Sequence, residues 1–254
     1  LGNHSEFLGA MDRSGMLSRF FVHDGGDTSQ WRLKGHAVRD FWQWVASWSV
    51  SMRKPSDLGY SDEGYELPPV NYIKHHIAAP IEAAWDAGQL FAIEASGMSE
   101  RRAVIRSNAE IRASMAAELV ASAPNEPWVI WCEFNAEAEA YAKAIPGAVD
   151  LCGSLSNDEK VEILHRFSAG EIRVLITKPK IAGFGMNWQH CHNTIFRPMD
   201  SYEAFYQALR RFHRFGQKHQ VNVHIIAEER EASITRNNEA KRERHFEIFE
   251  GATA

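Results

Sequence analysis

The sequence has 254 residues, of which 44% are hydrophobic, so it is long enough for one large hydrophobic core or two smaller ones. Its formal net charge is −5 at pH 7, so overall charge does not attract nucleic acid, and any such contact needs a local basic strip. The three cysteines are far apart and odd in number, which argues against a disulfide framework and favours a reducing compartment. No apolar run has membrane-spanning length, and no signal peptide is recognisable.

The first 66 residues are rich in aromatic side chains, and residues 38–52 have the spacing of a helix with one apolar stripe. The stripe consists of Phe41, Trp42, Val45, Trp48 and Met52. Such a stripe is more often core than a platform for stacking bases, so we interpret it as core. Pro55 follows closely, and proline ends a helix because it cannot continue the hydrogen-bond ladder.

Further along the chain, short apolar runs alternate with helical segments. We expect strands at 70–77, 128–132, 148–152, 173–177, 194–196 and 221–227, and helices at 81–121, 136–144, 157–169 and 201–215. Capping boxes are expected at Ser156 with Glu159 and at Asp200 with Glu203, and a C-cap at Gly170. This alternation predicts an α/β fold, a parallel sheet with helices on both faces and right-handed crossovers. The expected domains are residues 1–66 and 67–254.

The most informative stretch is DSYEAFYQALRRFHRFGQ, residues 200–217. Gln207 and Arg211 are four residues apart and Arg214 is three further on, so one continuous helix would place all three on one side. Two guanidinium groups and an amide on one face, without a nearby acidic residue, predict a site for a polyphosphate. The alternative is a solvated basic helix face, which this full spacing disfavours.

The run from Gln207 to Gln217 resembles the last conserved motif of superfamily-two helicases in its Swi/Snf-like form. In that family the motif lies on the second RecA-like domain and faces a nucleotide held mainly by the first. The resemblance implies that Arg211 and Arg214 are arginine fingers, which bring positive charge to the transferring phosphoryl group, and that Gln207 lines the same cleft. Arg210 departs from the small or acidic residue common in the family and receives no role.

A glycine-containing loop, TKPKIAGFGMN, follows the expected strand at 173–177. Its glycines permit close backbone approach, but it is neither a Walker A loop nor a Rossmann fingerprint. It resembles the fifth helicase motif, which touches the DNA backbone and couples it to the nucleotide. The resemblance implies nucleotide-binding roles for Gly183, Gly185 and Asn187, and contacts to DNA phosphates for Thr177, Lys178 and Lys180. The alternative is an ordinary strand-to-helix turn.

Three looser likenesses accompany these motifs. Residues 131–134 (WCEF) resemble the fourth helicase motif, and the alternative is a plain strand end. Gly153 and Ser154 are similar to a family loop that contacts the DNA backbone. The basic pair at 53–54, followed by Leu-Pro at 67–68, is similar to the passage from the family's helical protrusion into its second RecA-like domain.

The resemblance implies the C-terminal half of an ATP-dependent DNA helicase or translocase, of phage or bacterial type, located in the cytoplasm or at the nucleoid. In the family, ATP with Mg²⁺ closes two RecA-like domains and its release reopens them along DNA. The sequence contains no Walker A loop and no D-E-x-H box, and it begins at Leu1, so we expect a missing first RecA-like domain to supply those parts. This chain alone is expected to hydrolyse no ATP.

A different class of function remains open from the residues: a non-catalytic module that binds nucleic acid or a protein partner through its aromatic-rich first 66 residues. A metal site is not expected, because the adjacent residues of the run at 190–192 (HCH) cannot easily reach one ion. No membrane contact is expected.

Overall fold

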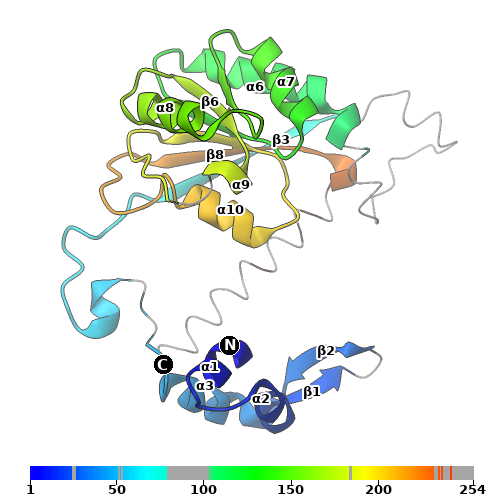
Figure 1. Cartoon of the computed structure of the whole chain (residues 1–254), viewed down its shortest axis with the longest axis vertical. Helices are drawn as coiled ribbons and strands as arrows, with labels where there is room; N and C mark the ends of the chain where they lie inside the picture. The colour runs from blue at the N-terminus through cyan, green and yellow to red at the C-terminus, as the bar shows by residue number, and fades with distance from the viewer. Residues whose placement is uncertain are drawn as a thin grey trace, which may run out of the picture. The chain divides into compact units, whose positions relative to one another are not determined.

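In the computed structural model, the chain divides into two compact units, residues 1–65 and residues 66–242, and each has its own hydrophobic core (Figure 1). The structure describes residues 1–24, 27–50, 52, 54–78, 103, 105–182, 185–231, 234, 236 and 241. The side chains of residues 24, 27–30 and 230 lie outside this description. So do most of the helix expected at 81–121 and two residues named above, Arg53 and Gly183.

The first unit contains short helices and a hairpin. Its elements are α1 (Gly2–Phe7), α2 (Arg13–Phe20), β1 (Phe21–Asp24), β2 (Asp27–Leu33), α3 (Val38–Ala46) and the 3₁₀ turns η1 (Gly35–Ala37) and η2 (Pro55–Leu58). Strands β1 and β2 pair in the antiparallel sense, and the sequence analysis did not predict these two strands. Their core is formed by Met16, Phe20, Ala37, Phe41 and Val45.

The expected helix at 38–52 is shorter in the structure, because α3 ends at Ala46. The hydroxyl of Ser47 donates to the carbonyl of Trp44 at 2.6 Å, and such side-chain bonds compete with the helical ladder. The interpretation of the stripe as core is confirmed for Phe41, which is buried, but is wrong for Met52, whose residue is 61% exposed.

The second unit contains a six-stranded, fully parallel sheet in an α/β arrangement. Its strands are β3 (Val70–Ile77), β4 (Trp128–Trp131), β5 (Val149–Leu151), β6 (Val174–Thr177), β7 (Asn193–Phe196) and β8 (Val221–Glu228). They lie in the order β3-β8-β7-β4-β6-β5. All neighbouring pairs are parallel, which confirms the predicted fold class.

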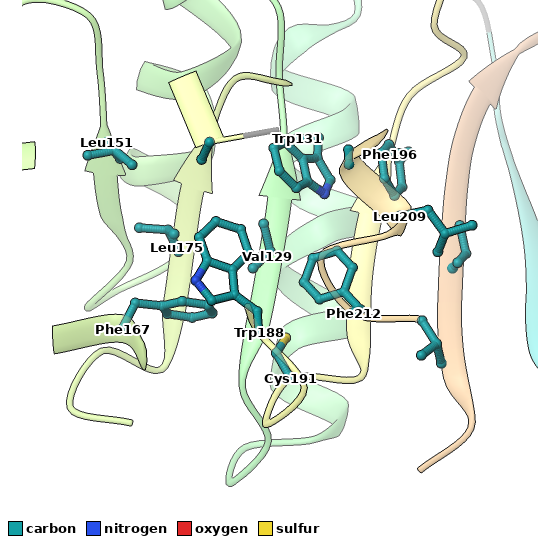
Figure 2. Close-up of a cluster of buried hydrophobic side chains, with 14 of the residues drawn as sticks. Val129, Trp131, Leu151, Phe167, Leu175, Trp188, Cys191, Phe196, Leu209 and Phe212 are labelled. Carbon is teal, nitrogen blue, oxygen red and sulfur yellow. The ribbon is translucent and has the colours of Figure 1, made fainter. Parts of the chain in front are cut away.

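Helices cover both faces of the sheet. They are α6 (Ala109–Ser122), α7 (Asn135–Ala144), α8 (Asn157–Ser168), α9 (Pro179–Ala182) and α10 (Tyr202–Leu209), with the 3₁₀ turn η3 (Glu229–Glu231) after β8. Helices α6 and α7 pack on one face, and α8, α9 and α10 pack on the other. The second unit has a buried hydrophobic cluster on each face of the sheet, and the one under α8, α9 and α10 is here named the larger core. Figure 2 shows Trp188 of this larger core between Phe167 and Phe212.

The helix expected at 201–215 is also shorter, since α10 ends at Leu209 and residues 210–216 form consecutive turns. Its N-cap is Ser201, whose hydroxyl oxygen accepts from the amide of Ala204 at 3.2 Å, so the capping box predicted at Asp200 is wrong. The helix stops where Phe212 becomes fully buried against Trp188, and Gly216 then takes a φ of +91° that favours glycine. By contrast, the capping box of Ser156 with Glu159 is confirmed.

Candidate functional site

The turns at residues 210–216, here named the arginine turn, bring four of the predicted residues together. The guanidinium of Arg211 donates from Nε to the backbone carbonyl of Gln207 at 3.0 Å, and from Nη2 to the side-chain Oε1 of Gln207 at 3.4 Å. Arg214 donates to the side-chain oxygen of Asn187. The predicted juxtaposition of Gln207 with the two arginines is therefore present, although these arginines lie beyond the end of the helix.

Both arginines also converge on one backbone atom. The carbonyl oxygen of Met186 accepts from Nη1 of Arg211 at 3.2 Å and from Nη1 of Arg214 at 3.4 Å. Met186 had no predicted role, because a backbone acceptor is not marked by any residue type. The contact joins the loop before β7 to the arginine turn, two segments that the sequence analysis assigned to separate motifs.

The charge of the two arginines is not neutralised by any described carboxylate. Arg211 is only 8% exposed, yet its partners among the described residues are neutral oxygens. Burial lowers the pKa of Arg211, and the charges of Arg214 and Arg210 lower it further. Two guanidinium groups held side by side without an acidic partner favour a multiply charged anion, since each gains a charge-assisted hydrogen bond from it.

The larger core fixes the backbone of the arginine turn. The amide of Trp188, which is fully buried, donates to the carbonyl of Arg211 at 2.9 Å. Gln217 donates from its side chain to the carbonyls of Cys191 and Phe212, both at 3.2 Å. Gln217 therefore holds the turn against the loop before β7 and does not point to a ligand.

Of the two loop glycines, Gly185 belongs to the described part of the chain and Gly183 does not. Gly185 has a φ of +79°, a left-handed conformation that side chains rarely adopt. Apart from its chain neighbours, no atom of the described residues lies within 4 Å of the position that a Cβ would occupy there. The glycine is thus required by backbone conformation and not by lack of space. Its role toward a nucleotide stays a prediction.

A second group of predicted residues lies at the carboxyl ends of β5 and β6, which are paired neighbours. The hydroxyl of Thr177 is buried and donates to the carbonyl of Leu151 at 3.4 Å. The ammonium group of Lys178 donates to the side-chain oxygen of Asn135 at the start of α7. Lys180, on α9, is exposed. The predicted DNA contact therefore fits the two lysines better than the side chain of Thr177.

Gly153 and Ser154 follow β5 and are both exposed. Lys160, in the first half of α8, donates to the carbonyl of Gly153 at 3.0 Å, and the hydroxyl of Ser154 lies 3.2 Å from the sulfur of Cys152. Lys160 and Asn135 were missed by the sequence analysis. Both residues lie at the start of a helix that follows a strand. Ligands of parallel sheets bind at these strand ends, so their positions in the sequence could have indicated them. Among the described residues, no hydrogen bond or ion pair joins this group to the arginine turn.

The segment at residues 131–134 is held by a buried ion network, here defined as Arg112, Glu137, Arg197 and Glu231. Arg112 lies 2.7 Å from Glu231 and 3.6 Å from Glu137, and Arg197 lies 3.4 Å from Glu137. Arg197 also pairs with Glu133. The network stabilises the end of β4, and all four of its side chains are buried.

The histidines and cysteine at 190–192 point to different neighbours. The ring of His190 lies 5.0 Å from that of Phe167, Cys191 is fully buried and His192 pairs with Glu126 at 3.4 Å. In the part of the chain that the structure describes, no three histidine, cysteine, aspartate or glutamate side chains are placed to hold a metal ion. Within the same residues, no helix has the length and apolar composition needed to cross a membrane.

Part of this chain matches a known protein family. Residues 112–216 match the family model of the helicase conserved C-terminal domain. That range includes Gln207, Arg211 and Arg214, and the predicted resemblance to a helicase C-terminal domain is confirmed for it. No curated protein matches the sequence. Among solved structures, the C-terminal part of the Fun30 ATPase domain is similar, with a TM-score of 0.46, 14% identity, 67% of this chain covered and 89% of that chain.

Proposed function

We propose that this chain is the C-terminal half of an ATP-dependent DNA helicase or translocase of the Swi/Snf-like type. In this proposal, Arg211 and Arg214 serve as arginine fingers for ATP held mainly by a first RecA-like domain. The observation that supports it best is that Gln207, Arg211 and Arg214 converge without a described carboxylate partner, inside the range that matches the helicase family. Structural arginines, such as those of the buried ion network, have carboxylate partners instead.

The two arginines fit a developing phosphoryl charge for a physical reason. Their present acceptors are neutral carbonyl and amide oxygens, and a phosphate oxygen is a stronger acceptor for a guanidinium group. The exchange leaves neutral acceptors behind, and isolating a buried carboxylate would cost more. When bound, Mg²⁺ with ATP supplies the transferring phosphoryl group and neutralises part of its charge. This chain's share is electrostatic stabilisation and orientation of that group.

DNA contacts belong to the second group of residues in this proposal. Lys178, Lys180 and Lys160 present ammonium groups, and Gly153 and Ser154 present backbone and hydroxyl groups, near the ends of β5 and β6. Such groups position a backbone without reading its sequence, as translocation requires. The net charge of −5 makes this local strip, and not the whole surface, the electrostatic footprint.

The test is DNA-stimulated ATP hydrolysis by this chain joined to a first RecA-like domain that carries a Walker A loop. We expect Arg214→Ala to lower kcat by about 10³-fold or more, as loss of an arginine finger does. The DNA Kd should stay within about twofold. Arg166→Ala is the matched control, since Arg166 lies on α8 and its side-chain partner among the described residues is Glu171, in an exposed pair at 3.4 Å. An unchanged rate in Arg214→Ala would contradict the proposal.

A binding module is the second candidate, and one observation favours it. Most of the exposed large hydrophobic side chains described lie in residues 1–65, with Phe7 89% exposed and Val50 81% exposed. Exposed apolar side chains gathered in one small unit are typical of an interaction surface. In that case the chain would bind its partner with the same affinity whether or not a nucleotide is present, and Arg214→Ala would change nothing.

A further inference from the structure

The arginine turn has an attachment on its other side, to the segment 66–69 that leads into β3. Nε2 of His213 lies 2.9 Å from the carbonyl oxygen of Pro68. A carbonyl only accepts, so the ring carries its proton on Nε2 and donates it to Pro68. Nδ1 is then the acceptor, and it faces Nη1 of Arg210 at a longer 3.5 Å.

The surroundings of His213 keep its ring in this neutral form. Burial lowers the pKa of His213, the carbonyl of Pro68 raises it, and the charge of Arg210 lowers it again. A neutral ring with one fixed tautomer makes a directional tether, because only one of its nitrogens can donate.

The partner of this tether is stiff. Residues 67–69 read Leu-Pro-Pro, and each proline fixes its own φ while restricting the residue before it. Immediately afterwards, Val70 pairs with Val221 in the sheet. Segment 66–69 is therefore a rigid strap fixed to β3 at one end, and it follows directly after residues 1–65.

The arginine turn is held on its opposite side by the loop before β7. The backbone amide of Trp188 donates to the carbonyl of Arg211, and the side chain of Gln189 donates to the carbonyl of Phe215. The side chain of Gln217, which follows the turn, donates to the carbonyl of Phe212. The side chain of His213 donates a hydrogen bond from the turn to the strap. In the sequence, His213 lies between Arg211 and Arg214. A shift of the strap thus acts on the turn at its middle.

We propose that His213 is a positioning residue, through which segment 66–69 sets the placement of Arg211 and Arg214. This inference rests on the proposed function, because it assigns the tether a role only if these arginines act on a nucleotide. A misplacement of about 1 Å at a reacting centre lowers a rate by about 10²-fold. The loss of one hydrogen bond that positions the arginines should therefore lower the rate of ATP hydrolysis. Movements of the chain before β3 reach the arginines through this contact.

The first experiment compares two substitutions in the chain joined to a first RecA-like domain. His213→Gln keeps a nitrogen donor near the Nε2 position, and His213→Phe keeps the ring without a donor. We expect His213→Phe to lower kcat of DNA-stimulated ATP hydrolysis by about 10–100-fold with the KM for ATP within about threefold, because the lost contact acts on the transition state. His213→Gln should stay within about threefold of wild type.

The strap supplies an independent check. Pro68→Gly combined with Pro69→Gly softens the segment and leaves both carbonyls in place. This change should also lower kcat, and His213→Phe added to it should lower kcat little further, since the two changes interrupt one connection. Losses that multiply would overturn the tether, as would equal losses in His213→Gln and His213→Phe. Thermal unfolding of each variant identifies a loss that comes only from instability.

The two proposals fail in different ways. If Arg214→Ala abolishes turnover while His213→Phe matches wild type, the tether is wrong and the arginine fingers stand. If Arg214→Ala leaves turnover unchanged, the proposed function is wrong whatever His213 does. A direct readout that needs no turnover is the ¹⁵N spectrum of the His213 ring, which should show the Nε2–H tautomer at pH 7. The Nδ1–H tautomer there would overturn the tether.

Discussion

At Arg211, the three described side-chain hydrogen bonds go to acceptors that carry no formal charge. The amide oxygen of Gln207 and the carbonyl of Met186 hold the guanidinium in place, and neither cancels its charge. An acid at the position of Gln207 would hold Arg211 more strongly but would remove the field that a phosphate needs. The amide is thus the side chain of this shape that orients the arginine and leaves it available.

The substitution Gln207→Glu tests whether this amide must be uncharged. The new carboxylate would stand where Oε1 now lies, 3.4 Å from Nη2 of Arg211, and would form a charge-assisted pair with it. We expect the KM for ATP to rise about tenfold or more in the chain joined to a first domain, with thermal stability equal or slightly higher. Gln207→Met, which removes the amide without adding charge, is the control and should have the smaller effect. A lower KM in Gln207→Glu would refute this reading of the residue.

At the scale of residues, the sequence predicted which side chains belong to the site better than it predicted the contacts that hold them there. The spacing of Gln207, Arg211 and Arg214 indicated their convergence, and the structure brings them together. The shared acceptor at Met186 was not predictable, because every residue carries a carbonyl and only the fold selects one. Nor did the sequence indicate that α10 would stop at Leu209, since that end depends on the burial of Phe212 against Trp188, a residue more than twenty positions away.

At the scale of elements, the buried ion network joins α6, α7, the end of β7 and η3. Arg112 is fully buried and also donates from Nε to the carbonyl of Ile226 at 3.2 Å. Burial raises the pKa of Glu231, and the nearby charge of Arg112 opposes this rise. Arg112 therefore favours the charged form of Glu231, against the effect of burial.

Removal of one partner should be costly. Arg112→Met leaves Glu137 and Glu231 buried with less positive charge, and breaking such a pair costs about 3–5 kcal/mol of unfolding free energy. Urea denaturation measures the loss. Arg166→Met removes an exposed pair and should cost less than about 1 kcal/mol. If the two variants unfold at the same urea concentration, the network does not stabilise the fold as described.

A histidine pair links the neighbouring strands β3 and β8. Nε2 of His75 lies 3.0 Å from Nδ1 of His224, so one ring donates and the other accepts, and the two cannot both be protonated without losing this bond. Burial lowers the pKa of His224 to about 4, and the neighbouring His75 adds to this effect. Burial also lowers the pKa of His75, with a further contribution from His76.

These shifts predict acid sensitivity with a definite sign. An ordinary histidine takes up its proton near pH 6.5, so below that pH the unfolded chain binds more protons than the folded pair. The free energy of unfolding should therefore fall as the pH drops from about 6.5 toward 4, by about 1–2 kcal/mol for this pair after allowance for partial exposure. His224→Gln should flatten this part of the curve. An identical pH dependence in wild type and His224→Gln would show that the pair does not titrate as described.

At the scale of the whole molecule, the sheet was predictable and the first unit was not. The strands β4 and β6 are short runs that are almost entirely apolar and buried along their whole length, and burial on both faces produces that pattern directly. In the first unit, the strand β2 mixes Asp27, Ser29 and Arg32 with Trp31, so its composition does not separate it from a loop. The strand order was likewise not predictable, because equivalent apolar runs carry no label for their neighbours.

At the scale of the whole chain, the proposed reaction needs parts that this sequence does not contain. In that proposal Arg211 and Arg214 stabilise the transferring phosphoryl group, but the sequence has no Walker A loop to hold the phosphates and no D-E-x-H box for the metal. The purified 254-residue chain should therefore turn over ATP no faster than its own Arg214→Ala variant, with or without DNA. Addition of a first RecA-like domain should restore a rate that depends on Arg214. Steady-state hydrolysis by the chain alone, abolished by Arg214→Ala, would mean that a complete phosphate site lies within these 254 residues and that the division of labour proposed here is wrong.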